Sequence, residues 1–364
     1  MPLLEKIVVQ DYRNIALAEL EFSPNVNCIS GNNGEGKTNL MDAIYYLSMC
    51  KSAFAASDRY NYRYGTQQFA LAGEYLMKNG LRAKFAICVS PEGKKFRKDD
   101  KPYPRVSEHI GELPIVMVSP SDISMVSEAG EERRRFLNAV LSQMDAEYLA
   151  DVQQYNRLLT LRNKMLKEQN PDAELLTVFD IRMSSYADRI YSKRKAFVEE
   201  LSPVVSQFYK ALSGGQEEVS VAYCSDIEKA PLSELLARGR ERDIALKFTG
   251  SGVQRDDLDF VMDGHPIRRC GSQGQQKSFL VSLKFAQYEL MKKAYGFAPM
   301  LLLDDVFDKL DMNRISNLLA LVAGAEFGQI FISDSNKVRM SSIVDGITSD
   351  SAYFETVNGS FTRQ

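Results

Sequence analysis

The segment Gly31–Thr38, GNNGEGKT, constrains the fold of this chain more than any other feature. It matches the pattern G-x-x-x-x-G-K-[ST], in which glycines let the backbone approach phosphates and the lysine reaches the terminal phosphate groups. A short apolar run with Val26 and Ile29 precedes it, and apolar residues at helical spacing, Leu40 and Ile44, follow it. This strand, loop and helix would aim backbone N–H groups and a helix N-terminus at an anion. The sequence therefore predicts an α/β fold with a phosphate-binding loop.

A second segment supplies the acidic group that such a loop requires. In MLLLDD, Met300–Asp305, four apolar residues predict a buried strand, and two aspartates follow. A carboxylate at this position completes a magnesium site together with the hydroxyl of the loop. We predict that Asp304 and Thr38 hold Mg²⁺ and that Asp305 orients or deprotonates the attacking water. The predicted catalytic residues are Lys37, Asp304 and Asp305.

Two segments compete for the role of the signature that contacts nucleotide in ABC-type ATPases. They are LSGGQEEV, Leu212–Val219, and GSQGQQKS, Gly271–Ser278. A signature opens a helix shortly before the acidic strand, because the helix dipole must face the γ-phosphate of ATP held by the opposite subunit. The first segment follows a predicted helix and leads into an alternating strand, so we interpret it as a helix C-cap and turn. The second segment opens a helix that Gly296 ends. Its predicted nucleotide contacts are Ser272, Gly274 and Gln275.

The apolar pattern divides the chain into regions. Strand-like runs (KIVVQDY, NVNCIS, AKFAICV and PIVMV) dominate to about residue 121, and helical spacing dominates residues 131–212. The stretch 169–174, QNPDAE, divides that helical insert into two limbs, and Pro203 predicts a kink or a helix start. We predict a lobe I of residues 1–121 and 298–364. Lobe II, residues 122–297, would carry the helical insert 131–212 and the signature motif 271–277.

Composition narrows the class of protein. With 364 residues, 45% hydrophobic and 26% charged, the chain can bury a large core. Its net charge of −3 means that any nucleic-acid binding must come from local basic clusters, at residues 94–98, 133–135, 193–195 and 238–242. Five cysteines without a C-x-x-C pair indicate reduced thiols and no structural zinc. We expect a cytoplasmic protein without a membrane span, because no apolar run approaches about 18 residues.

Together these blocks resemble the RecF family of ABC/SMC-like ATPases almost end to end. The resemblance rests on VVQDYRNI with its Arg13–Asn14 pair, GNNGEGKTN, SPSDISMVSEAGEERRRFLN, YNRLLTLRNKML, RDDL, GSQGQQKS and LLLDDVFDKLD. It implies an ABC/SMC-like P-loop ATPase head of mixed β-sheets plus helices, with ATP and Mg²⁺ as cofactors. The nucleotide-binding residues it implies are Gly31, Asn32, Asn33, Gly34, Glu35, Gly36, Lys37, Thr38, Asn39, Ser272, Gly274, Gln275 and the D-loop Asp311, with Thr38 and Asp304 at the metal.

The resemblance also implies a function and partners. It implies a nucleoid-associated, ATP-dependent DNA-binding protein of recombinational repair, replication-fork maintenance and the SOS response. Such a protein binds junctions of single- and double-stranded DNA at gaps and, with RecR and RecO, helps load RecA. The P-loop and the signature of one chain can meet around ATP only in a head-to-tail homodimer, so we expect ATP to induce one. Residues 133–135 and 193–195 are candidate DNA contacts on a clamp formed by the helical lobes.

The sequence departs from the family pattern at three places. Gly252–Gln254 replaces Gly-Pro-His, Asn138 stands where an aspartate is common, and Ser333–Ser335 stands where ABC ATPases carry a switch histidine. The residue that senses the γ-phosphate is therefore open. Asp305 is one methylene shorter than the glutamate of many ABC ATPases, so we expect slow hydrolysis that acts as a switch. The resemblance implies that DNA stimulates this weak ATPase activity.

The main alternative is a soluble ATPase subunit of an ABC transporter. Such a subunit should carry the switch histidine and use the Leu212 segment as its signature, and both features point away from it. A full SMC protein would need far longer coiled-coil arms than this helical insert provides. A guanine-nucleotide switch lacks its aspartate after Asn336, and His109 and His265 are too isolated to form a metal cluster or a hydrolase triad.

Overall fold

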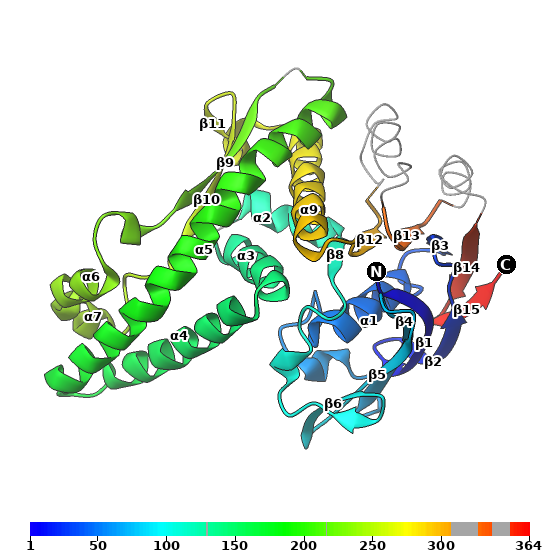
Figure 1. Cartoon of the computed structure of the whole chain (residues 1–364), viewed down its shortest axis with the longest axis horizontal. Helices are drawn as coiled ribbons and strands as arrows, with labels where there is room; N and C mark the ends of the chain where they lie inside the picture. The colour runs from blue at the N-terminus through cyan, green and yellow to red at the C-terminus, as the bar shows by residue number, and fades with distance from the viewer. Residues whose placement is uncertain (129, 216, 307–326, 337–349) are drawn as a thin grey trace. The chain divides into compact units, whose positions relative to one another are not determined.

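The computed structural model describes residues 1–128, 130–215, 217–306, 327–336 and 350–364 (Figure 1). These residues form two compact units. Unit 1 comprises residues 1–122, 211–213 and 284–364, and unit 2 comprises residues 123–210 and 214–283. Helix α9 (Gln273–Tyr295) is divided between the units at residue 283, whereas the sequence placed that lobe boundary at 297.

Unit 1 contains a six-stranded antiparallel sheet built from the N-terminal part of the chain. Its order is β2-β1-β4-β5-β6-β7. The predicted strands KIVVQDY and AKFAICV are confirmed as β1 and β5, while β2 and β4 were not predicted. The strands are β1 (Leu3–Tyr12), β2 (Ile15–Glu21), β4 (Phe69–Leu76), β5 (Arg82–Ser90), β6 (Gly93–Lys98) and β7 (Lys101–Pro102).

A second six-stranded sheet of unit 1 positions the predicted nucleotide site. Its order is β15-β14-β3-β13-β12-β8, and all pairs except β14 with β15 are parallel (Figure 1). Strands β3, β12 and β13 are buried along their whole length, which explains their continuous apolar runs. Parallel strands bring their carboxyl ends to one edge, where ligands of such sheets bind. The strands are β3 (Val26–Ser30), β8 (Ile115–Val118), β12 (Met300–Asp304), β13 (Ile330–Asp334), β14 (Ser351–Val357) and β15 (Ser360–Arg363).

The helices and turns of unit 1 connect these two sheets. Helix α1 (Lys37–Met49) buries apolar residues such as Leu40, Ile44 and Leu47, which confirms the predicted amphipathic helix after the loop. The 3-10 turns described in this part of the chain are η1 (Asp58–Asn61), η2 (Val106–Glu108) and η3 (Pro120–Ile123), the last at the boundary with unit 2. Unit 1 thus joins the phosphate-binding loop to a buried parallel sheet.

Unit 2 contains the helical insert and a small antiparallel sheet of order β11-β10-β9. Its elements are α2 (Ser124–Ser127), α3 (Glu131–Met144), α4 (Ala146–Met165), α5 (Ala173–Ser213), β9 (Val219–Cys224), η4 (Asp226–Glu228), α6 (Leu232–Arg238), α7 (Arg240–Leu246), β10 (Asp257–Met262), β11 (His265–Pro266) and α8 (Ile267–Cys270). The two predicted limbs are confirmed. The first is interrupted at Asp145, whose side chain caps α4, and the second is the single helix α5, which continues through Pro203.

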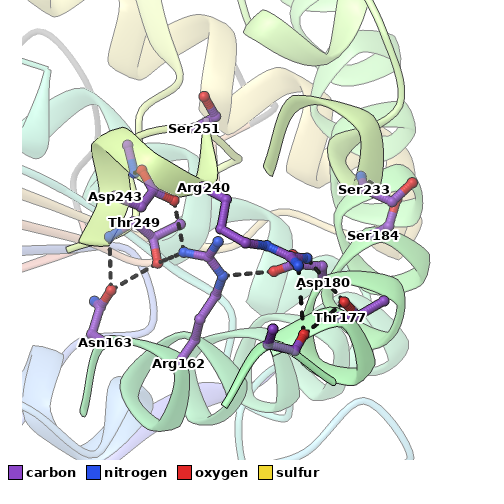
Figure 2. A network of polar contacts seen from close by, with 12 residues as sticks. Arg162, Asn163, Thr177, Asp180, Ser184, Ser233, Arg240, Asp243, Thr249 and Ser251 are labelled. Atoms are coloured by element: carbon purple, nitrogen blue, oxygen red, sulfur yellow. Dashed lines mark hydrogen bonds and ion pairs between the residues drawn. The ribbon is translucent and has the colours of Figure 1, made fainter. Parts of the chain in front are cut away.

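Buried ion pairs hold the helices of unit 2 together (Figure 2). The Arg162 side chain is fully buried; its Nε donates to Asp180 at 2.7 Å, and its Nη1 donates to Asp243 at 2.8 Å. Arg240 also donates to Asp180, at 2.9 Å. One arginine of α4 therefore joins α5 and α7. Arg240, predicted within a basic surface cluster, serves this internal network.

Candidate nucleotide site

The phosphate-binding loop leaves β3 and enters α1 through glycines that no other residue could easily replace. Gly31 has a φ of +154°, and a Cβ there would lie 2.6 Å from the carbonyl oxygen of Thr356. Lys37 is buried, and its Nζ donates to the carbonyl oxygens of Gly31 at 2.9 Å and Asn32 at 3.2 Å. The loop borders a cavity of about 270 Å³. Its lining residues are Asn33, Gly34, Gly36, Lys37, Thr38, Asn39 and Asp305.

The Arg13–Asn14 pair supports this loop from the N-terminal sheet. The Asn14 side chain donates to the carbonyl oxygen of Gly34 at 3.3 Å and accepts from the side chain of Asn39 at 2.7 Å. The Arg13 guanidinium donates to Asn39 at 3.2 Å and lies 2.8 Å from the buried carboxylate of Asp42. The pair recognised from family resemblance therefore orients the loop and the first turn of α1.

The C-terminal strands also hold the loop, and sequence reasoning missed this contact. The carbonyl oxygen of Glu35 accepts from Thr356 Oγ1 at 3.0 Å and from the Gly359 N–H at 2.8 Å. The Glu35 side chain accepts from the Asn358 N–H. These partners lie more than 320 residues away in the sequence. Nothing in the local pattern of residues 351–359 could have indicated them.

The hydroxyl of Thr38 and the carboxylate of Asp304 meet at the edge of the parallel sheet. Thr38 Oγ1 donates to Asp304 Oδ2 at 2.8 Å, and Ser333 Oγ donates to Asp304 Oδ1 at 2.5 Å. Burial raises the pKa of the Asp304 carboxyl, and the hydrogen bonds from Ser333 and Thr38 lower it in part. Hydroxyl and carboxylate oxygens are the ligands that Mg²⁺ prefers, so the donor set fits this ion.

Asp305 and Ser333 lie beside this pair. Asp305 has a φ of +45°, and its N–H donates to the carbonyl oxygen of Ser333 at 3.2 Å and to Ser333 Oγ at 3.1 Å. The unusual backbone conformation places Asp305 on the lining of the cavity. The sequence left open which group replaces the switch histidine. The structure places Ser333 against the carboxylate of Asp304.

We expect Asp304→Asn to stabilise the nucleotide-free protein while removing magnesium-dependent nucleotide binding. A folded-state pKa above the unfolded value means that the stabilising contribution is present at low pH and is lost as pH rises through the folded pKa. At neutral pH the buried charge is therefore unfavourable, and a neutral amide relieves it. Thermal unfolding of the wild type and Asp304→Asn at pH 7 and at pH 5, in metal-free buffer, measures this difference in stability. A variant that is less stable than wild type at pH 7 would contradict the expectation, and Asp305→Asn serves as the adjacent control.

The second signature-like segment opens a helix, as predicted. Ser272 Oγ accepts from the Gln275 N–H at 3.2 Å, and Gln275 Oε1 accepts from the Ser272 N–H at 2.7 Å. This reciprocal arrangement is a capping box at the start of α9, and Ser272 is exposed. Gly296, with a φ of +67°, ends the helix. The predicted D-loop residue Asp311 lies outside the described residues.

The first signature-like segment ends a helix, which confirms its interpretation as a cap and turn. Helix α5 ends at Ser213, and Gly214 has a φ of +79° with its N–H bonded to the carbonyl oxygen of Lys210. Strand β9 begins at Val219. The glycines therefore close a helix and do not present a helix N-terminus to an anion.

Each of the two basic clusters predicted to contact DNA contains one arginine that is buried in unit 2. Arg133 is 4% exposed and donates to Asp257 at 2.6 Å, and Arg194 is 3% exposed and donates to Asp256 at 2.9 Å. The remaining members pair as well: Arg134 with the carbonyl of Asp256, Arg135 with Glu131 and Glu132, Lys193 with Asp145, and Lys195 with Glu228. The prediction was wrong for Arg133 and Arg194, because buried and paired guanidiniums cannot reach a phosphate.

The departures from the family pattern also have internal roles in unit 2. The Gln254 side chain accepts from the Tyr155 hydroxyl and donates to the carbonyl oxygen of Ser251 at 2.9 Å. Asn138 Oδ1 accepts from the Tyr148 hydroxyl at 2.7 Å and from Arg194 at 3.1 Å. Asn138 therefore joins a part-buried hydrogen-bond network with Arg194, and Gln254 links Tyr155 of α4 to the loop at Ser251.

A phosphate-binding loop after a buried parallel strand, with an acidic strand end beside it, defines a P-loop ATPase. Its fold is that of an ABC/SMC-like ATPase head. A family model described as an AAA domain matches residues 6–178. The DNA replication and repair protein RecF of Parabacteroides distasonis is 41% identical over 357 residues, which cover 98% of both chains. The same-named protein of Bacteroides thetaiotaomicron is 40% identical and covers 98% of this chain and 97% of its own. The chain belongs to the RecF family.

Solved structures agree with this assignment. The structure of the recombination mediator protein RecF-ATP in the RecFOR pathway has a TM-score of 0.90 at 28% identity and covers 100% of this chain and 98% of its own. An Smc head domain from Pyrococcus furiosus, with a TM-score of 0.59 at 16% identity, shares the fold alone. Relatives of this kind do not favour the alternative of a transporter subunit. Within the described ranges, no helix has the length and apolar character needed to cross a membrane.

Proposed function

We propose that this protein is an ATP-dependent DNA-binding ATPase of recombinational repair and replication-fork maintenance. The observation that carries the proposal is the contact of Thr38 with Asp304 beside the buried Lys37, at one cavity of the parallel sheet. The fold and the similarity to RecF proteins over nearly the whole chain support the same conclusion. ATP and Mg²⁺ are the cofactors that this set of residues fits.

The residues at this cavity divide the work of ATP hydrolysis. The loop residues 31–39 cradle the phosphates, and the ammonium of Lys37 stabilises the terminal phosphate groups as negative charge redistributes. Thr38 and Asp304 would hold Mg²⁺, which, when bound, would neutralise charge on the phosphate oxygens. Asp305 orients the attacking water, and its short side chain makes hydrolysis a slow reset of the protein. Steady-state phosphate release at a rate comparable to a helicase would contradict this slow reset.

The signature acts on the nucleotide of a second copy of the chain. Ser272 is exposed at the N-terminus of α9, where the helix dipole favours an anion. A head-to-tail pair would bury two nucleotides, each between the loop of one chain and residues 272–275 of the other. ATP then favours the dimer because it binds the dimer better than the monomer. The D-loop residue Asp311 is assigned to the same interface on the strength of family resemblance.

The dimer binds DNA through phosphate contacts, which do not depend on sequence and weaken with salt. Its proposed substrate is a junction of single- and double-stranded DNA at a gap, on the nucleoid. Its proposed partners are RecR and RecO, through which it helps load RecA. RecF structures described within the RecFOR pathway support this placement.

We expect Ser272→Arg to abolish the ATP-dependent gain in DNA affinity, and Ser213→Arg to retain it. An arginine at Ser272 would fill the space that the γ-phosphate of the second copy needs, whereas Ser213 lies in the turn that ends α5. Binding to a labelled gapped duplex, with and without ATP at two salt concentrations, measures this gain. Damage by Ser213→Arg alone would reassign the signature to the first segment, and an absence of DNA binding in all variants would overturn the proposed function.

A further inference from the structure

The first signature-like segment contacts the second one directly. Gln275 Nε2 donates to Glu217 Oε1 at 2.7 Å, which joins LSGGQEEV to the start of α9. The turn that carries Glu217 is fixed on its other side. The Glu218 N–H donates to Asp263 Oδ1 at 2.8 Å, and the Asp263 N–H donates to the carbonyl oxygen of Glu218 at 2.9 Å. Glu217 therefore projects toward α9 from an anchored end of the β9–β10 pair.

The contact leaves the Gln275 amide with both of its polar groups engaged. Its Oε1 accepts from the Ser272 N–H, and its Nε2 donates to Glu217. A glutamine side chain is flexible in isolation, and fixing it costs conformational entropy. Two bonds at opposite ends of the amide select one orientation. The chain of contacts thus runs from Glu217 through Gln275 to the backbone of Ser272.

The Glu217 carboxylate is partly buried, and its burial carries an energetic cost. Its second carboxylate oxygen, Oε2, is buried and has no hydrogen-bond partner among the described residues. Burying a polar atom without a partner is unfavourable. The positive end of the α9 dipole and the bond to Gln275 offset this cost in part. The carboxylate of Glu217 is thereby held at the N-terminus of α9, which faces a phosphate in the proposed function.

We propose that Glu217 is a positioning residue of the nucleotide signature. It holds Gln275 in the capping box, so that Ser272 and Gly274 are already oriented when the nucleotide of a second copy arrives. Preorganised groups lose less entropy on binding, and the interface is correspondingly tighter. The inference rests on the proposed function. In this proposal the LSGGQEEV turn does not contact nucleotide itself and acts by orienting Gln275 in the segment GSQGQQKS.

The experiment compares Glu217→Ala and Glu217→Gln with Glu218→Ala, an exposed neighbour that changes charge equally. Sedimentation with a slowly hydrolysed ATP analogue gives the dimerisation constant, and a fluorescent nucleotide at low protein concentration gives binding to the monomer. Without Glu217, the Gln275 side chain must be ordered at each of the two sites when the dimer forms, which predicts about 25-fold weaker dimerisation for Glu217→Ala. Glu217→Gln retains an acceptor for Gln275, so we expect it to dimerise as the wild type does. Binding of the fluorescent nucleotide to the monomer should be unchanged in all three variants.

A double variant separates positioning from general stability. Once Gln275→Ala has removed the capping side chain, adding Glu217→Ala should cause no further loss of dimerisation. Wild-type dimerisation of Glu217→Ala, or equal losses in Glu217→Ala and Glu218→Ala, would overturn the inference while leaving the proposed function intact. Failure of the wild-type protein to dimerise with the nucleotide would instead overturn the proposed function itself.

Discussion

Replacing Lys37 by alanine is expected to lower the rate of ATP hydrolysis by roughly 100-fold or more, which is the scale of removing one preorganised charge-stabilising donor. Lys37 is the ammonium on the cavity lining, and its Nζ already lies on the carbonyl oxygens of Gly31 and Asn32. Those oxygens hold it in place for a phosphate. Steady-state phosphate release at saturating ATP measures the effect.

Lys84→Ala provides the matched control for Lys37→Ala. Lys84 is an exposed lysine of β5 in the same unit, so its removal changes the net charge equally without touching the cavity. Its hydrolysis rate should equal that of the wild type. Hydrolysis by Lys37→Ala at the rate of Lys84→Ala would show that the cavity beside Asp304 is not where ATP reacts.

Replacing Arg162 by alanine is expected to destabilise unit 2 by about 3–5 kcal/mol, the usual cost of removing one partner from a buried ion pair. The change leaves the buried carboxylate of Asp243 without its cation and that of Asp180 with Arg240 alone, and it opens a cavity between α4, α5 and α7. Thermal unfolding measures the loss, and hydrogen exchange should localise it to residues 146–250.

Arg157→Ala tests whether burial, and not simply the loss of an arginine from α4, causes this effect. Arg157 lies on the same helix and is exposed. Its replacement should change the free energy of unfolding by less than about 0.5 kcal/mol. Equal unfolding temperatures for the two variants would mean that the network in Figure 2 contributes little to stability.

The parts of the site that could be predicted from sequence are those that follow from local patterns. A glycine-rich loop between an apolar strand and a helix, and an apolar run that ends in Asp304, each fix their own local structure. The direction of the helix relative to its glycines likewise distinguished the segment at Ser272 from the segment at Gly214. That these residues contact nucleotide stays a prediction.

The parts that sequence reasoning missed depend on contacts between distant segments. The pairing of Arg133 with Asp257 spans 124 residues, so the sequence shows a basic cluster where the fold has a buried ion pair. The contact of Thr356 with the Glu35 carbonyl spans 321 residues. Glu217 shows the same limit. Its segment matches a signature letter for letter, but its proposed role follows from the hydrogen bond that it makes with Gln275.

We propose that ATP closes a dimer in which Ser272 of each copy contacts the nucleotide of the other. Sedimentation velocity of the wild type and Ser272→Arg, each with Mg²⁺ and ATP, with ADP, or without nucleotide, measures whether this dimer forms. We predict a monomer-to-dimer shift for the wild type with ATP alone and monomers throughout for Ser272→Arg. A wild-type protein that stays monomeric with ATP, or a Ser272→Arg variant that dimerises as the wild type does, would contradict the claim.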